Sequence, residues 1–524
     1  MAKQPSFLNS VKWAYTGNWG EKIFSGLFSI IVAGILGPRD FGVAAIALVY
    51  IGFLQLFLDQ GLAAALIQRK HLEQEHADAV FWMDLALSVF LVAVSILFSR
   101  SWAAINHAPQ VAVIIPVYSL CIVIEALSIV QTALLRRDMD FKSLSIRTNV
   151  SVLLSGIFGI VLAFKGFGVW ALVAQQLAKD VIALTLLWKL SRWHPRFEFS
   201  WKHLKDLLSF SIPNFGAQLG VFADGQAGSI VLGLFFGPVA VGLYRIAERV
   251  TNSIVTMAMA SIQSVALPQF SRLQDQPEEL AKSVLTCIRL SAAVTLPSLA
   301  GLAAVSYPLM ATVGVQWIPA VPALKVLSAL GMISIFGFFT GPLMQALGKT
   351  RQIALLEWAR AIVNVAILAC AGLLAHSAAV NWQVMAISMG RFAASFFLVV
   401  PVFVYILLSL CRISLRDFFF AVVPSICAAI STAGTVMLFH LLVGAHWLNS
   451  AKPAVVLGVE VGLGGIVGLA VLLRLESQLY RSVVGMIKGS ARSADRDEEL
   501  SEAERETVLQ GVAADESISR HSNL

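Results

Sequence analysis

Long apolar stretches separated by short polar segments run through almost the whole chain. A helix needs about 20 apolar residues to cross a bilayer, and fourteen stretches come close to or exceed that length: 15–37, 41–66, 79–99, 111–135, 148–165, 167–189, 207–236, 238–268, 284–306, 322–347, 353–375, 380–408, 417–443 and 452–473. The pattern predicts an all-α polytopic membrane protein with about fourteen transmembrane helices. A count of twelve remains the alternative.

The composition excludes an ordinary soluble domain. The 524 residues are 58% hydrophobic and 13% charged, whereas soluble domains are about one quarter charged. The first 22 residues lack a short apolar core followed by a small-residue cleavage site, so we expect no removable signal peptide. The net charge of +7 lies in loops rather than on a folded basic face, so we expect no nucleic-acid partner.

The basic residues predict an orientation. If both termini are cytoplasmic, 28 of the 38 Lys and Arg residues fall in cytoplasmic segments, Arg360 among them. The opposite loops hold only five: Arg39, Arg100, Lys165, Lys325 and Lys452. Because Lys and Arg accumulate on the cytoplasmic side, we expect both termini to be cytoplasmic.

An internal repeat links the two halves of the chain. Gly37-Pro38, Gly42 and Ala47 recur as Gly237-Pro238, Gly242 and Ala247, each 200 residues further on. A weaker echo relates 131–134 to 344–347. Chance could explain a single Gly-Pro turn, but six intervening spans give both copies one orientation, as in parallel repeats. Two six-helix bundles enclosing a cleft are therefore predicted.

These boundaries predict five regions along the chain. They are an N-terminal six-helix bundle (1–190), a cytoplasmic linker (191–206), a C-terminal six-helix bundle (207–408), two extra helices (409–480) and a cytoplasmic tail (481–524). The tail is polar and charged, which is typical of disorder.

The strongest charged cluster in a predicted span is Arg245, Glu248 and Arg249. Charges in the hydrocarbon are costly and usually face a cavity or a partner. Arg245 and Arg249 lie one turn apart on one helix face, and two guanidinium forks match the oxygens of a pyrophosphate. The alternative is that Arg245 pairs with Glu248 and the cluster is structural.

Further ionisable residues extend the candidate site. Arg391 stands alone in the twelfth stretch and would need an anion, water or a carbonyl as a partner. Lys22 lies near the cytoplasmic end of the first stretch and either contacts substrate or extends to the headgroups. Asp224 is the first candidate for coupling to a proton or sodium ion, and Glu125 is the second, because a mid-span carboxylate must pair with a cation or become protonated.

Cysteine and histidine predict no metal site and no cofactor. The five cysteines are scattered through apolar stretches without a C-x-x-C pair, which is typical of small packing residues. The nine histidines form no cluster on one helix face.

Several motifs carry a family resemblance over roughly residues 10–480. The most specific is Asp59-Gln60-Gly61-Leu62, followed by Ala65 through Lys70 and Val80-Phe81-Trp82; further matches are 137–142, 166–172, 242–244 with Arg249, and 267–273. Together they resemble the polysaccharide transporter branch of the multidrug/oligosaccharidyl-lipid/polysaccharide flippase superfamily, close to the colanic-acid exporter type.

This resemblance implies a V-shaped pair of bundles that works by ion-coupled alternating access. The implied substrate is an undecaprenyl-pyrophosphate-linked oligosaccharide, carried from the cytoplasmic to the periplasmic leaflet of a bacterial inner membrane. Implied partners are membrane lipid, a proton or sodium ion, and polysaccharide synthesis proteins. Family members often have Asp or Asn just before I-x-x-G in the seventh span, where this chain has Gly228; Asp224, one turn earlier, is the candidate substitute.

Three other functions stay open from the sequence. A membrane polysaccharide polymerase or glycosyltransferase should carry a sizeable outward loop with catalytic groups, but every predicted outward loop is short, so we expect no enzyme. A multidrug or cation antiporter of the same superfamily should have an acidic cavity. A non-transporting scaffold is the third alternative.

Overall fold

The computed structural model describes residues 7–58, 62–69, 72–191, 193–197, 200–450 and 452–475. Every regular element within these ranges is a helix, so the all-α prediction is confirmed. The predicted tail at 481–524 and the Asp59-Gln60-Gly61 part of the sequence signature lie outside the described residues.

The chain forms one series of helices before residue 191 and a second series after residue 200. The first series is α1 (Phe7–Ile35), α2 (Pro38–Leu58), α3 (Leu62–Gln68), α4 (Gln74–Ile105), α5 (Val111–Tyr118), α6 (Leu120–Arg137), α7 (Phe141–Phe164) and α8 (Val169–Leu190). The second series is α9 (Trp201–Phe236), α10 (Pro238–Arg272), α11 (Pro277–Ala304), α12 (Ser306–Val313), η1 (Val315–Ala320), α13 (Val321–Phe338), α14 (Thr340–Ala346), α15 (Thr350–Leu374), α16 (Val380–Ala394), η2 (Ser395–Val399), α17 (Val400–Cys411), α18 (Leu415–Ser450) and α19 (Pro453–Leu475).

Twelve helical segments among the described residues are long and apolar enough to cross a membrane. The chain is therefore a multi-pass membrane protein. The predicted total of fourteen equals these twelve together with α1 and α10, which are long but are not among the twelve. That total stays a prediction.

Several predicted spans are interrupted in the structure. The predicted span 41–66 is described as two helices, α2 up to Leu58 and α3 from Leu62, and residues 59–61 between them lie outside the described residues. The span predicted at 111–135 breaks at Ser119, shortly after Pro116. The twelfth span contains a π-helical turn, η2, directly before α17, where Pro401 lacks the N–H that would continue the α-helical hydrogen bonding. Helix α9 begins at Trp201, inside the predicted linker 191–206, and the division of the chain into five regions stays a prediction.

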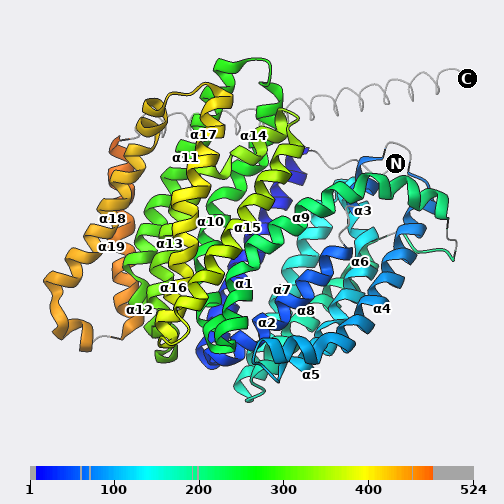
Figure 1. Cartoon of the computed structure of the whole chain (residues 1–524), viewed down its shortest axis with the longest axis horizontal. Coiled ribbons are helices and arrows are strands. Elements are labelled where there is room, and N and C mark those ends of the chain that lie inside the picture. The colour runs from blue at the N-terminus through cyan, green and yellow to red at the C-terminus, as the bar shows by residue number, and fades with distance from the viewer. Residues whose placement is uncertain are drawn as a thin grey trace, which may run out of the picture.

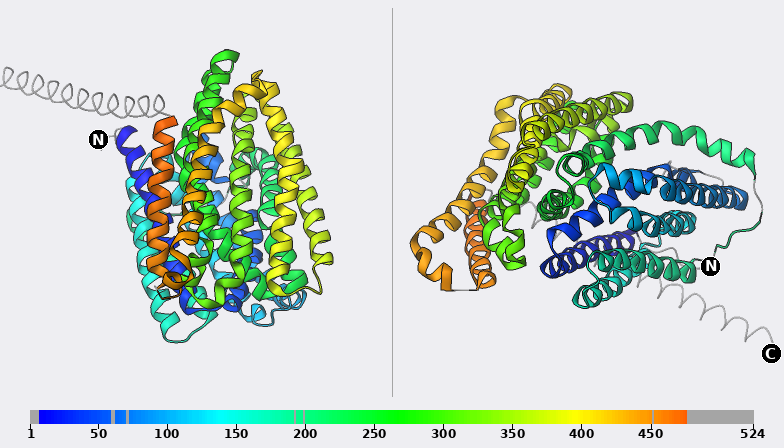
Figure 2. Two further views of the ribbon diagram at one scale, coloured as in Figure 1. Left: turned by 90° about the vertical axis from the view of Figure 1, so that its left-hand side faces the viewer. Right: turned by 60° about the horizontal axis from the view of Figure 1, so that its bottom comes forward.

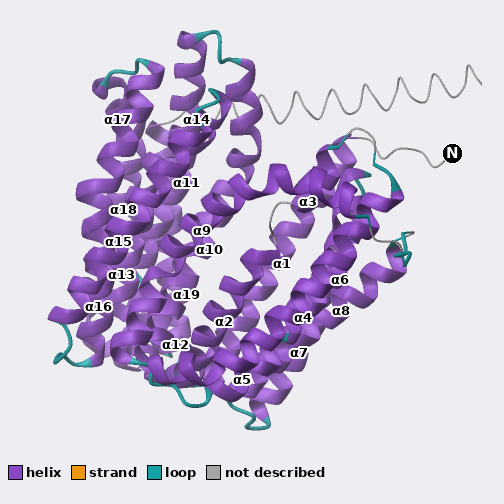
Figure 3. Cartoon of the chain, turned by 45° about the vertical axis from the view of Figure 1, so that its right-hand side comes forward, coloured by secondary structure: helices purple, strands orange, loops and turns teal. Residues whose placement is uncertain are grey.

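The two series form two bundles arranged as a V (Figure 1). The bundles meet near α2, α5 and α12, and they separate toward the end where the chain starts (Figure 3). Helix α9 crosses from the first bundle to the second, and α18 and α19 form a hairpin on the outer edge beside α11 (Figures 1 and 2). We call α1–α8 the N-bundle and α9–α17 the C-bundle.

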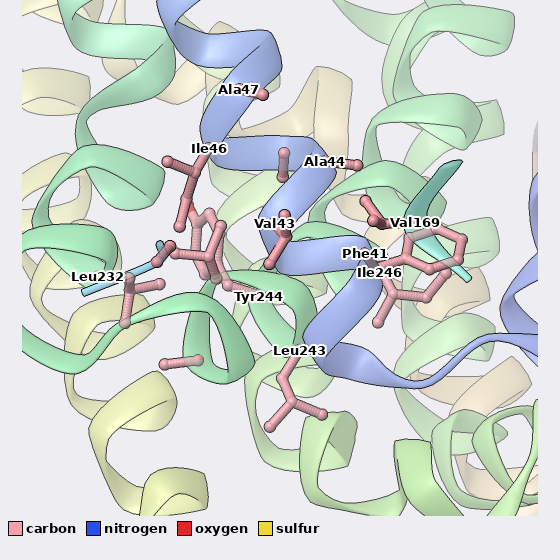
Figure 4. Close-up of a cluster of buried hydrophobic side chains, with 14 of the residues drawn as sticks. Phe41, Val43, Ala44, Ile46, Ala47, Val169, Leu232, Leu243, Tyr244 and Ile246 are labelled. Carbon is pink, nitrogen blue, oxygen red and sulfur yellow. The ribbon is translucent and has the colours of Figure 1, made fainter. Parts of the chain in front are cut away.

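The two copies of the repeat pack against each other where the bundles meet. A Cβ atom on Gly42 would overlap the carbonyl oxygen of Pro238, and one on Gly242 would overlap that of Pro38. Only glycine permits this approach of α2 and α10. Buried side chains surround the contact, among them Phe41, Val43, Ile46, Leu232, Leu243 and Tyr244 (Figure 4). The repeated residues thus form the junction between the bundles.

Two residues of the family-resemblance motif 137–142 stabilise helix ends in the N-bundle. Arg137 donates hydrogen bonds to the carbonyl oxygens of Leu66, Ile67 and Arg69 at 2.9, 3.2 and 2.6 Å. These carbonyls lie at the C-terminal end of α3, where a helix leaves its acceptors unpaired. Asp140 caps the start of α7 by accepting the backbone N–H of Ser143 at 3.1 Å. These interactions give Arg137 and Asp140 a structural role.

Candidate functional site

A cavity of about 480 Å³ lies between the two bundles. Its walls come from α1, α2, α5, α7 and α8 of the N-bundle and from α10 of the C-bundle; we call it the inter-bundle cavity. Its charged lining residues, among those that the structure describes, are four cations and one carboxylate: Lys22, Lys179, Arg245, Arg249 and Glu248. An anion would be attracted to this space. Three of the four substrate-binding candidates from the sequence meet there, and Arg391 is the exception.

Glu248 is held between two guanidinium groups from different helices. Its Oε2 lies 3.0 Å from Arg245 Nη1, and its Oε1 lies 2.9 Å from Arg391 Nη1 on α16. Arg391 also donates to the Tyr244 hydroxyl at 2.7 Å. The prediction that Arg391 stands alone is wrong. Its partner is Glu248, which lies 143 residues away in the sequence and therefore could not be identified from local spacing. The pairing of Arg245 with Glu248 is present, as the structural alternative required.

Arg249 differs from its neighbour one turn away. Its Nη2 donates to the hydroxyl of Ser25 on α1 at 3.0 Å, and no described carboxylate lies within ion-pair distance of it. Both Arg249 and Lys22 are exposed within the inter-bundle cavity. Their charges are thus available to a bound anion, whereas much of the Arg245 charge is offset by Glu248.

The packing of Tyr244 explains why residue 228 is a glycine. A Cβ atom at Gly228 would lie 2.6 Å from the Tyr244 hydroxyl oxygen. Glycine therefore leaves room for the tyrosine hydroxyl to reach Arg391. This contact accounts for the departure from the Asp or Asn that the resemblance led us to expect at that point.

Asp224 is buried on α9 and pairs with residues of α15. Asn364 Nδ2 donates to its Oδ1, and Arg360 Nη2 lies 3.1 Å from its Oδ2. The same Arg360 nitrogen lies 2.7 Å from Glu357 Oε2. The assignment of Arg360 to a cytoplasmic segment is wrong, because Arg360 lies within α15 and points to a buried carboxylate. A guanidinium thus offsets the charge of Asp224, which makes its burial tolerable.

Glu125 occupies a different place from Asp224. It lies on α6 in the N-bundle and accepts a hydrogen bond from Gln55 Nε2 at 2.6 Å. It lines a second cavity, whose lining residues all belong to N-bundle helices. The two ion-coupling candidates are therefore not brought together. Among the described residues, no group of three His, Cys, Asp or Glu side chains could hold a metal ion.

Two cationic residues of interest were missed from the sequence. Lys179 lines the inter-bundle cavity from α8, where it lies 3.9 Å from Glu21. Arg360 holds Asp224. The available signal was the same for both, a basic residue inside an apolar stretch. This signal is weak for both residues, because Lys179 lacks the paired spacing of Arg245 and Arg249, and because Arg360 lies near the predicted cytoplasmic loop that contains Lys349 and Arg351.

The fold and this site define a membrane protein of two facing bundles with a cationic cavity between them. Residues 31–322, more than half of the chain, match the family described as polysaccharide biosynthesis protein. The chain belongs to this family.

Curated relatives agree with the family. The chain is 29% identical over 314 residues to the succinoglycan biosynthesis transport protein ExoT of Rhizobium meliloti, covering 60% of this chain and 63% of that one. It is 25% identical to the teichuronic acid biosynthesis protein TuaB of Bacillus subtilis (57% and 62%), and 22% identical to the lipopolysaccharide biosynthesis protein WzxC of Escherichia coli (60% and 65%). The matches span less than two thirds of each relative.

Solved structures show the fold. The lipid II flippase MurJ in an inward closed conformation superposes with a TM-score of 0.67 at 14% identity, covering 90% of this chain and 99% of that one. An inward-facing multidrug resistance MATE family transporter gives 0.58 at 17% identity, covering 75% and 95%. The predicted bundle-pair fold is confirmed.

Proposed function

We propose that this protein is a flippase for a lipid-linked oligosaccharide. It carries an undecaprenyl-pyrophosphate-linked glycan from the cytoplasmic to the periplasmic leaflet of a bacterial inner membrane. The observation that carries the proposal is the inter-bundle cavity, whose described lining has four cationic side chains and one carboxylate. The names of the curated relatives, which refer to the synthesis or transport of three different polysaccharides, support a glycan as cargo.

Arg249 is the principal ligand of the pyrophosphate in this proposal. A pyrophosphate that leaves water must exchange its hydration for charged donors, and each such hydrogen bond contributes roughly 1.5–3 kcal/mol. Arg249 and Lys22 are exposed to the cavity from opposite bundles, so the anion would bridge the bundles. Arg245 and Lys179 add charge. Arg391 is a positioning residue, since its guanidinium holds Glu248 and Tyr244.

Alternating access would proceed by rocking of the bundles about the Gly42–Gly242 junction. The bundles separate toward the end where the chain starts (Figure 3). The concentration of basic residues in the loops at that end supports a cytoplasmic location for it and for both termini. In this orientation the described conformation would accept cargo from the cytoplasmic leaflet, and neighbouring polysaccharide synthesis proteins would dock on the same side.

Ion coupling is assigned to Asp224 in this proposal. A proton or sodium ion that binds Asp224 would replace Arg360, whose guanidinium lies 3.1 Å away. The released Arg360 could stay paired with Glu357 at 2.7 Å. Exchange of one cation for another keeps the buried carboxylate neutralised throughout. We prefer Asp224 to Glu125 because Glu125 lies in a spacious cavity and bonds Gln55.

The alternatives fit the geometry less well. A drug or cation antiporter needs a cavity that attracts cations, and the described lining of the inter-bundle cavity has the opposite charge. A polymerase or glycosyltransferase needs room for catalytic groups at the outer end. The described connections predicted there are short: α9 and α10 are joined by Gly237 alone, and α7 and α8 by 165–168.

The proposal is tested with purified protein in proteoliposomes. A fluorescent oligosaccharide linked to undecaprenyl pyrophosphate is placed in both leaflets, and a membrane-impermeant quencher reports its outer-leaflet fraction. We expect protein-dependent exchange of this lipid, and none of a fluorescent phosphatidylethanolamine control. Movement of a cationic dye without movement of the glycolipid would support the antiporter instead.

A further inference from the structure

A second cavity lies wholly within the N-bundle. It has a volume of about 510 Å³ and is lined by α1, α2, α6, α7 and α8; we call it the N-bundle cavity. This volume falls in the range of about 300–1,000 Å³ that is usual for small-molecule sites. Its lining is unusually polar for the inside of a membrane bundle, and includes Gln55, Glu125, Thr132, Arg147, Gln176 and Asp180. Placing such polar groups inside the membrane costs free energy, and they usually mark a functional site.

The polar side chains in this cavity are held in place by one another. Gln55 donates to Glu125 Oε2 at 2.6 Å, and Gln176 donates to both oxygens of Asp180 at 3.1 Å. Arg147 Nη1 donates to the Thr132 hydroxyl at 2.9 Å, while its buried Nε has no hydrogen-bond partner. The cavity therefore presents oriented acceptors together with a donor that a ligand could satisfy.

The two cavities differ in the net charge of their linings and therefore suit different ligands. The described lining of the N-bundle cavity has three carboxylates and three cations: Glu21, Glu125, Asp180, Arg136, Arg147 and Lys179. The inter-bundle cavity has an excess of three cations. A balanced set of donors and acceptors suits a neutral ligand with many hydroxyl groups. Trp13 and Phe141 add aromatic surface to the same lining, which suits the apolar face of a sugar ring.

The two cavities adjoin each other. Gln176 and Lys179 of α8 line both, and the successive residues Glu21 and Lys22 of α1 line the N-bundle cavity and the inter-bundle cavity respectively. One ligand could therefore place an anionic group in the inter-bundle cavity and a neutral polar group in the N-bundle cavity. A sugar pyrophosphate has this construction, because its first sugar is bonded directly to phosphate.

We propose that the N-bundle cavity binds the carrier-proximal sugar of the lipid-linked glycan, as a neutral pyranose. This inference rests on the proposed function and extends it by giving the glycan a site of its own. Gln55, Glu125 and Arg147 hydrogen-bond the sugar hydroxyls, and Gln176 and Lys179 lie where sugar and phosphate join. Specificity for the first sugar is then set by N-bundle residues, whereas affinity for the carrier is set by Arg249 and Lys22.

Equilibrium binding of two probes to full-length protein in nanodiscs tests this inference. The probes are undecaprenyl pyrophosphate and undecaprenyl pyrophosphate carrying one glucose or one galactose. For the wild type we expect tighter binding of at least one sugar-bearing probe than of the bare carrier. Gln55→Met and Glu125→Gln should each weaken the sugar-bearing probe by about five- to tenfold and leave the bare carrier unchanged. Gln383→Met on α16 is the matched control and should alter neither.

Each outcome separates the two proposals. Arg249→Ala should weaken both probes, and unchanged affinity of Gln55→Met for the bare carrier shows that this variant is folded. Equal wild-type affinity for all probes, or equal weakening of bare and sugar-bearing carrier by Gln55→Met, would overturn the sugar site and leave the flippase proposal standing. Failure of the wild type to bind any of these lipids would overturn the flippase proposal, and the sugar site with it.

Discussion

Gly42 and Gly242 lie at equivalent positions of the repeat and touch each other's helices across the junction of the two bundles. A Cβ atom on either one would overlap a proline carbonyl oxygen on the opposite helix, Pro238 for Gly42 and Pro38 for Gly242. The contact is reciprocal because the two helices are related as copies of one motif. In the proposed mechanism, this contact is the point about which the bundles move.

Gly42→Ala should destabilise the protein. The added methyl group must push α2 away from Pro238, and overpacking of this kind costs about 1–3 kcal/mol. Gly434→Ala is the matched control, because a Cβ atom there meets nothing within 4 Å and alanine favours the helix. Thermal unfolding in detergent is the measurement. A midpoint for Gly42→Ala as high as that of Gly434→Ala would show that the junction is looser than described.

Glu248→Gln should also destabilise the protein, through a different cause. It leaves Arg245 and Arg391 as neighbouring cations without their shared carboxylate, and breaking a buried ion pair costs about 3–5 kcal/mol. The double variant Glu248→Gln, Arg391→Met removes one of the orphaned charges and should recover part of the loss in unfolding midpoint. A double variant less stable than the single one would argue against this network.

Much of the fold could be predicted from the sequence because membrane helices leave a local signal. Apolar length located most of the spans, and the Gly-Pro repeat pointed to the residues that join the bundles. Contacts between residues far apart in the sequence were harder to predict. Arg137 donates to the carbonyl oxygens of Leu66, Ile67 and Arg69, which lie 68 to 71 residues away along the chain. The pattern of apolar residues along the chain does not predict such a contact.

Asp224 and Arg360 should respond to mutation in opposite ways. Asp224→Asn removes the proposed ion ligand and leaves Arg360 facing a neutral amide, so transport should fall and lose its dependence on sodium or pH. Arg360→Gln frees Asp224 and Glu357 to bind a cation, so ion dependence should become stronger. The measurement is glycolipid flipping with sodium or choline as the cation, at two pH values. Unaltered ion dependence in both variants would remove Asp224 from the coupling mechanism.

Cysteine labelling should place the two ends of the bundles on opposite sides of the membrane. In a background without Cys121, Cys287, Cys370, Cys411 and Cys427, Ser271→Cys should be reached only from the cytoplasm. Gln110→Cys should be reached only from the periplasm; both positions are exposed. Labelling of the two positions from the same side would contradict the proposed orientation.

The candidate site was harder to predict than the fold. Arg245, Glu248 and Arg249 could be found together because helical spacing brings them to neighbouring positions. Arg391 was found as an intramembrane charge, but its partner Glu248 lies on another helix. Asp224 and Arg360 are likewise joined only by the packing of α9 against α15. A single sequence gives the depth of a charge in the membrane, whereas its partner is decided by tertiary structure.

The central claim is that Arg249 holds the pyrophosphate of the lipid carrier in the inter-bundle cavity. It is tested most directly by the flipping rate of undecaprenyl-pyrophosphate-linked oligosaccharide in proteoliposomes containing matched amounts of wild-type, Arg249→Lys or Arg249→Ala protein, at subsaturating lipid. Loss of a charged donor should lower the rate of Arg249→Ala by about ten- to hundredfold. Arg249→Lys keeps the charge without the fork and should fall between the two. Wild-type flipping by a fully folded Arg249→Ala protein would contradict the claim.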